Sequence, residues 1–111
     1  SAVLKGKKFY NIGRGVDVVK RTFRHNDIAI DENGGERERR VSRAHARIGY
    51  IKGSGFYLQA EDGCLQNNSR TRIMRGDKLI DLKNPLQTES LCDGDRIELA
   101  REVYILFELI N

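Results

Sequence analysis

The chain has 111 residues, which suits one domain and is long enough to bury a core without disulfides or metal. Its net charge of +4 is mild for a nucleic-acid-binding protein, because 16 acidic residues are interspersed with 20 basic ones. No apolar run reaches the roughly 20 residues of a membrane span, and no signal peptide is visible. We therefore expect a single domain over residues 1–111, excised from a larger protein.

Cys64 and Cys92 are the two cysteines of the chain. Isolated thiols form neither a disulfide framework nor a zinc site. We interpret them as buried thiols in a reducing compartment. This favours the cytoplasm, or the nucleus if the source is eukaryotic, and it implies no metal.

Short apolar segments, bounded by turn residues, predict strands along the first third of the chain. The first covers residues 9–12 and runs into Gly13-Arg14-Gly15, where the glycines permit a backbone turn. Residues 16–25 carry a mixed basic run, which we interpret as a loop excursion. Residues 28–30 form the next predicted strand, and residues 31–36 a flexible connection.

The segment Val41-Ser42-Arg43-Ala44-His45-Ala46-Arg47-Ile48 alternates small or apolar residues with basic ones. As a strand it places Ser42 and Arg43 at its start, beside a loop. A hydroxyl next to a guanidinium is a donor pair suited to an anion, above all a phosphate. Arg14, between two glycines, is another candidate donor. The hypothesis is that a β-fold brings Arg14, Ser42 and Arg43 together around a phosphate on a partner.

A helix is an alternative for the same region. Val41, Ala44 and Ile48 also fit helical spacing. A helix over residues 36–48 would carry several arginines along one side, as a basic helix does in a nucleic-acid groove. Gly49 and the alternating segments elsewhere favour the strand, but the pattern alone leaves both open.

The remaining chain continues the strand pattern. Predicted strands cover residues 56–60, 71–74, 79–82, 97–99 and 103–110, and the last is apolar on both faces, which suits a strand between two sheets. The total is about nine to eleven short strands with turns every 8 to 12 residues. This predicts an all-β fold, a two-sheet β-sandwich.

Two polar segments are candidates for contacts around a bound phosphate. Arg37-Glu38-Arg39-Arg40 leads into the central segment, and Gln66-Asn67-Asn68-Ser69-Arg70 is a loop without a hydrophobic anchor. Asparagine amides offer both donors and acceptors to a peptide backbone. Either segment could instead be a solvated loop.

The pattern gives little support to catalysis. Ser42 and His45 are three residues apart, which on a strand places them on opposite faces. Neither cysteine has a partner base nearby in sequence, and the histidines and cysteines lack zinc-ligand spacing. We expect neither an enzyme nor a cofactor.

Four motifs occur in a fixed order along the chain: Ile12-Gly13-Arg14, Asn26-Asp27-Ile28, Val41-Ser42-Arg43-Ala44-His45-Ala46, and Leu91-x-Asp93-Gly94-Asp95-x-Ile97. Together they resemble the forkhead-associated (FHA) domain. That resemblance implies an FHA/SMAD-like β-sandwich of about eleven strands. It also implies a site for phosphothreonine peptides in loops at one end.

The resemblance assigns roles residue by residue. Arg14 and Ser42 match the positions that contact the phosphate, and Arg43 matches a neighbour that touches phosphate or peptide. His45 matches a histidine that braces the binding loops, and Gly13 allows the loop that aims Arg14.

The chain departs from the family pattern in two loops. The peptide-holding asparagine is normally in a Ser/Thr-Asn-Gly-Thr run, but here the sequence is Asn67-Asn68-Ser69-Arg70-Thr71. Asn68 is our first choice for that role and Asn67 the second, with Ser69 and Arg40 as further peptide contacts. The loop from residue 14 to residue 26 is longer than usual, so it could add contacts or partly cover the site.

The expected function is phosphothreonine-dependent binding of a protein or peptide, in signalling or regulated assembly. One alternative is a domain of the same fold that binds an unphosphorylated partner or self-associates. Another is a basic nucleic-acid-binding domain. A membrane partner is not expected.

Overall fold

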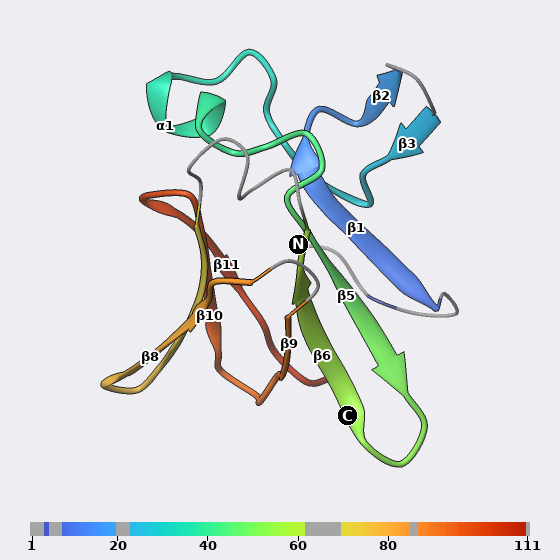
Figure 1. Ribbon diagram of the computed structural model, residues 1–111, viewed down its shortest axis with the longest axis vertical. Coiled ribbons are helices and arrows are strands. Elements are labelled where there is room, and N and C mark those ends of the chain that lie inside the picture. The colour runs from blue at the N-terminus through green and yellow to red at the C-terminus, as the bar shows by residue number, and fades with distance from the viewer. Residues whose placement is uncertain (1–3, 5–7, 20–22, 62–69, 85–86, 111) are drawn as a thin grey trace.

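The computed structural model describes residues 4, 8–19, 23–61, 70–84 and 87–110 (Figure 1). Its elements in chain order are β1 (Phe9–Arg14), β2 (Asp17–Val19), β3 (Phe23–His25), β4 (Ile28–Ile30), α1 (Glu36–Arg39), β5 (Ala46–Ile51), β6 (Gly55–Ala60), β7 (Thr71–Arg75), β8 (Lys78–Leu82), β9 (Thr88–Ser90), β10 (Arg96–Leu99) and β11 (Val103–Leu106).

The strands form two main sheets and a small ribbon. One sheet has the order β4-β1-β5-β6-β9, the other β11-β10-β7-β8, and β2 pairs with β3 alone. Strands β1 and β4 run parallel, and the other pairs are antiparallel. The prediction of an all-β, two-sheet sandwich of about eleven strands is confirmed for the described residues.

Alternate residues of the strands fill the space between the sheets. In the five-stranded sheet, Tyr10 and Leu58 lie opposite Ile48 on the neighbouring strands. In the four-stranded sheet, Ile73 lies opposite Ile97. These side chains are buried in one hydrophobic core, and each contributes about 1.5–3 kcal/mol through its burial. This core is the rigid frame behind the loops.

The central segment begins as a turn, not as a strand. Strand β5 starts at Ala46, five residues later than predicted. The Ser42 N–H donates to His45 Nδ1 at 3.0 Å, and the Ala44 N–H to Ser42 Oγ at 3.4 Å. Such local bonds from side chain to backbone compete with regular ladder pairing, and they form a turn within residues 42–45 before β5 begins.

The alternative basic helix is wrong. Helix α1 covers only Glu36–Arg39 and ends at Arg40, where residues 40 and 41 donate back to carbonyls three residues earlier. Glycine at the N-cap offers no side-chain cap to this short helix. In the described part of the chain, no helix is long and apolar enough to cross a bilayer.

The predicted excursion over residues 16–25 contains a short hairpin. Strands β2 and β3 pair through Asp17↔His25, Val18↔Arg24 and Val19↔Phe23. Val19 and Phe23 lie on its exposed face, while Val18 and Arg24 are partly buried. The hairpin projects beyond the end of β1, on the same side of the molecule as α1 (Figure 1).

Two burial predictions are wrong. Strand β11 ends at Leu106 and is an edge strand, so Tyr104 and Leu106 are exposed and only alternate residues face the core. Cys92 is an exposed free thiol in the turn before β10. Cys64 is outside the described residues.

Candidate functional site

The end of β1 places Arg14 against the turn that contains Ser42. The Arg14 N–H donates to the Ser42 carbonyl at 3.0 Å, and Arg14 Nε donates to the Val41 carbonyl at 3.0 Å. Among the described residues, the terminal nitrogens of this guanidinium have no acceptor. The side chain is therefore held in place through one nitrogen, while its remaining N–H groups are available for an anion.

Glycines on both sides of Arg14 make this approach possible. A Cβ at position 13 would lie 2.7 Å from the carbonyl carbon of Arg43 and 2.9 Å from Asn26 Nδ2, closer than any side chain allows. Gly15 has φ of +84°, and its N–H donates to the Ile30 carbonyl at 2.8 Å. The first glycine admits the loop of Arg43, and the second turns the chain toward β2.

Ser42 lies below the surface, with 7% of its area exposed. Its hydroxyl oxygen accepts the N–H of Ala44, so the hydroxyl proton is left to donate. The Arg14 guanidinium contacts the carbonyl of Val41, and the hydroxyl belongs to Ser42, the next residue of the same turn.

His45 connects the turn to the neighbouring strands. The ring is fully buried, its Nδ1 accepts the Ser42 N–H at 3.0 Å, and its Nε2 lies 2.8 Å from the Arg70 carbonyl oxygen. Both bonds form only when the imidazole is neutral with its proton on Nε2. Burial lowers the pKa of His45 to about 4, with Arg24 contributing in the same direction, against the bond to Arg70.

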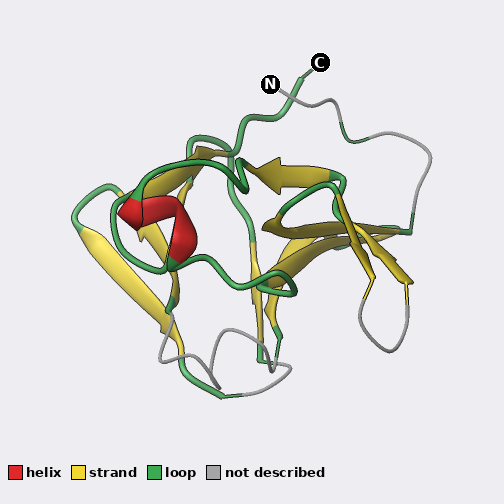
Figure 2. Ribbon diagram, turned by 90° about the horizontal axis from the view of Figure 1, so that it is seen from above, coloured by secondary structure: helices red, strands yellow, loops and turns green. Residues whose placement is uncertain are grey.

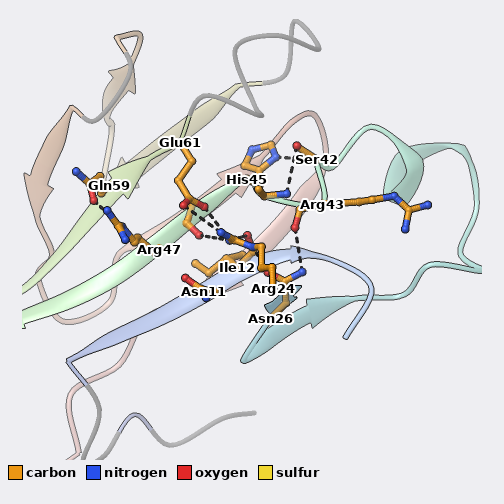
Figure 3. Close-up of polar contacts among 12 residues, drawn as sticks. Asn11, Ile12, Arg24, Asn26, Ser42, Arg43, His45, Arg47, Gln59 and Glu61 are labelled. Atoms are coloured by element: carbon orange, nitrogen blue, oxygen red, sulfur yellow. Dashed lines mark hydrogen bonds and ion pairs between the residues drawn. The ribbon is translucent and has the colours of Figure 1, made fainter. Parts of the chain in front are cut away.

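Asn26 joins the two loops that flank Arg14. The side chain is buried, and its Nδ2 donates to the Gly15 carbonyl at 2.9 Å. It also donates to the Arg43 carbonyl at 2.9 Å (Figure 3). Its Oδ1 accepts Arg24 Nε at 2.8 Å. In the sequence, Asn26 is visible only as part of a family motif, since its partners are 11 and 17 residues away.

Arg24 anchors the hairpin to the sandwich. Its guanidinium donates to Glu61 Oε1 at 3.0 Å and lies 2.7 Å from Glu61 Oε2 (Figure 3). It also donates to the carbonyls of Ile12 and Ala46 at 3.1 and 3.3 Å. Its side chain is 16% exposed, so Arg24 belongs to the frame of the fold, a role that the predicted loop excursion over residues 16–25 did not include.

The FHA domain family model matches residues 10–100. The chain belongs to the FHA domain family. No curated protein and no solved structure matches it significantly. FHA domains are protein-interaction modules that bind phosphopeptides.

The guanidinium of Arg43 is set apart from the other two predicted phosphate donors of this FHA domain. Its side chain extends away from Ser42 and His45 (Figure 3) and pairs through NH1 with Glu32 Oε1. The pairing of Glu32 with Arg43 was not predicted, because residues 31–36 were interpreted as a flexible connection. The structure thus brings Arg14 and Ser42 together, whereas Arg43 is paired with the Glu32 carboxylate of the same chain.

The predicted peptide contacts are less defined. Arg40 is the C-cap of α1, and its NH2 lies 3.8 Å from Glu36 Oε1, a loose pair at the surface. Asn67, Asn68 and Ser69 lie outside the described residues, so their predicted roles stay predictions.

The FHA domain offers no catalytic arrangement at this turn. His45 bonds backbone groups through both ring nitrogens, so it does not abstract the Ser42 hydroxyl proton. This replaces our argument from opposite strand faces, because residues 42–45 are not a strand. The described residues also contain no group of three or more His, Cys, Asp or Glu side chains placed to hold a metal ion.

Proposed function

We propose that this FHA domain binds phosphothreonine in a protein or peptide, and that Arg14, Ser42 and Arg43 are its phosphate-binding residues. The observation that supports this most is the position of Arg14, whose guanidinium is fixed by the Val41 carbonyl beside the Ser42 turn. Gly13, His45 and Asn26 support the same turn from within. The role in signalling or regulated assembly is part of the proposal.

The chemistry of the ligand fits these donors. A phosphothreonine carries a charge of about −1.5 to −2 at neutral pH and has three strong acceptor oxygens. Each charge-assisted bond contributes about 1.5–3 kcal/mol when it is well aligned. Two or three such bonds supply a large part of a micromolar affinity, about −8 kcal/mol, before the costs of ordering the peptide.

We further propose that the flanking residues of the peptide are read by loops at the same end of the sandwich. Arg40 at the end of α1 is one such contact, and Asn67, Asn68 and Ser69 are others. We place the activity inside the cell, in the cytoplasm, because an exposed free thiol such as that of Cys92 is typical of a reducing compartment.

The decisive experiment is calorimetry with a phosphothreonine peptide selected from a library, alongside its unphosphorylated and phosphoserine forms. Wild type should bind the phosphothreonine form in the micromolar range and the unphosphorylated form negligibly. Arg14→Ala should weaken binding by roughly 10- to 100-fold, because it removes one charge-assisted contact.

Arg96→Ala is the matched control. It removes the same charge from an exposed side chain of β10, which belongs to the other sheet, so it should leave the affinity within about twofold. Equal affinity for phosphorylated and plain peptides would overturn the proposal in favour of an unphosphorylated partner.

A further inference from the structure

Glu32 occupies a fixed place in the turn that follows β4. The register Arg14↔Ile30 and the bond from the Gly15 N–H to the Ile30 carbonyl bring the end of β4 beside the end of β1. The Asn33 N–H donates to Asp31 Oδ1 at 2.9 Å, and the Gly34 N–H donates to the Asp31 carbonyl at 3.2 Å. These bonds define a turn with Glu32 at its second position, so its backbone is anchored next to the phosphate-binding residues.

The Glu32 carboxylate lies between the two loops that carry Arg14 and Arg43. Its Oε1 pairs with Arg43 NH1. Its Oε2 would lie 3.1 Å from a Cβ built on Gly15, the residue directly after Arg14. The carboxylate therefore lies at the rim of the site, and both it and Arg43 are about half exposed, at 44% and 45%.

This pair bears on how Arg43 meets a ligand. Arg43 follows Ser42 directly, yet its side chain extends outward to Glu32 and away from the Ser42 hydroxyl (Figure 3). Because the Arg43 guanidinium extends away from the Ser42 hydroxyl, it must turn back from the carboxylate before Ser42 and Arg43 can hold one anion together. The charge-assisted bond to Glu32 is lost when the bond to phosphate forms. Only the difference in free energy between these two bonds therefore favours phosphate binding.

We propose that Glu32 is a positioning residue that holds Arg43 away from the phosphate in the ligand-free domain and thereby lowers its affinity for phosphate. The inference rests on the proposed function, and it extends it by naming an internal competitor for the ligand. The competitor lowers the affinity for every anion that needs Arg43 by the same factor, so it weakens a carboxylate mimic of phosphothreonine as well.

The first test is a titration of the whole domain with inorganic phosphate, followed through the NMR signal of the Arg43 Nε–H. An exposed Arg–carboxylate pair is a weak interaction, so Glu32→Gln should lower the half-saturating phosphate concentration by roughly two- to fivefold. Glu108→Gln is the matched control, since it removes one negative charge from an exposed residue near the C-terminus, far from α1 and β2 (Figure 1). An Arg43 signal that responds equally in wild type and Glu32→Gln, or in neither, overturns the inference.

The second test is a double-mutant cycle with a phosphothreonine peptide. The gain from Glu32→Gln should disappear in an Arg43→Ala background, because Glu32 acts through Arg43. A gain in affinity that persists without Arg43 reflects the change in net charge and overturns the inference. Weaker binding by Glu32→Gln also overturns it, because it would mean that Glu32 orients Arg43 for the ligand. If no phosphopeptide binds wild type, the proposed function fails, and the phosphate titration alone decides the role of Glu32.

Discussion

His45 illustrates how a single buried side chain joins segments that are distant in sequence. Its ring accepts the backbone N–H of Ser42 and donates to the Arg70 carbonyl. The backbone N–H of His45 donates to the Ile12 carbonyl at 3.1 Å. His45 thus connects the turn that contains Ser42 to β1 and to the residue that precedes β7. A protonated ring would lose the acceptor at Nδ1, so the contact with Ser42 depends on the neutral form.

The buried ring predicts a dependence of stability on pH. The pKa of His45 is lowered from 6.5 to about 4 in the folded protein, so between these values the unfolded chain binds a proton that the folded chain does not. The free energy of unfolding should therefore fall as the pH is lowered from 6.5 to 4, by about 3 kcal/mol in total from this group, and this term should change little below pH 4.

Urea denaturation of wild type and His45→Gln at several pH values isolates this contribution, because the other titrating groups are common to both. The difference between the two proteins should narrow as the pH falls from 6.5 to 4. An NMR titration of the wild-type ring serves if the variant does not fold. A His45 midpoint near 6.5 would contradict the prediction.

At the scale of elements, the β2–β3 hairpin is the main local addition to the sandwich. Arg24 anchors it, reaching from β3 across the carbonyls of β1 and β5 to Glu61, directly after β6. Asn11 of β1 adds a bond from its Nδ2 to the His25 carbonyl at 3.1 Å. Asn26 then links Arg24 by hydrogen bonds to the loops of Gly15 and Arg43. The hairpin is therefore part of the frame of the site and fixes where its loops lie.

Arg24→Ala should lower the free energy of unfolding by about 3 kcal/mol, because it leaves the Glu61 carboxylate, only 17% exposed, without this cation. The value is at the lower end for buried pairs since both side chains keep some contact with water. Urea denaturation measures the loss. Adding Glu61→Gln should restore part of the stability, and a loss below about 0.5 kcal/mol in the single variant would show that the hairpin is not anchored there.

The contrast between β4 and β5 shows what sequence patterns reveal about this fold. Strand β4 was predicted at its observed bounds, because two isoleucines around a small residue follow a turn signal. The predicted start of β5 was wrong by five residues, because hydrogen bonds of the Ser42 and His45 side chains form a turn there before the strand begins. Strands β2 and β3 were missed, since Asp17–Val19 and Phe23–His25 mix apolar with charged residues and pair only with each other, outside the main sheets.

The same limit applies to the site. Arg14 and Ser42 were found because each belongs to a motif with a fixed local sequence, and the structure places them beside one another. Glu32 and Arg24 carry no such local signal, and the motif that contains Asn26 does not reveal its partners. Their roles arise from pairing with residues 11 to 37 positions away, which only the folded chain reveals.

For the whole molecule, the two ends of the sandwich are closed by different polar networks. The end with the site depends on Arg24, His45 and Asn26. At the other end, Arg75 of β7 binds Asp95 through two nitrogens, both at 2.8 Å, and also donates to the Ser90 carbonyl of β9 in the opposite sheet. Arg75 holds the pKa of the buried Asp95 below its usual range.

This separation predicts that stability and binding respond to different arginines. Arg75→Ala leaves a fully buried carboxylate without its cation and removes a bond between the sheets, so it should cost about 3 kcal/mol of stability. The folded fraction should still bind a phosphothreonine peptide within about twofold of wild type, because Arg14 and Ser42 are at the other end. Arg14→Ala should do the reverse, losing affinity with a stability change below about 1 kcal/mol, since within the described part of the chain its guanidinium donates to a single carbonyl.

Thermal denaturation of the two variants measures their stability. Calorimetry, run well below their melting temperatures, measures their affinity for the peptide. The contrast follows from the architecture: the core fixes the sheets, and the loops at one end carry the donors. If Arg75→Ala weakened peptide binding as strongly as Arg14→Ala does, the two ends would be coupled through the core, and the site could not be treated as loops on a rigid frame.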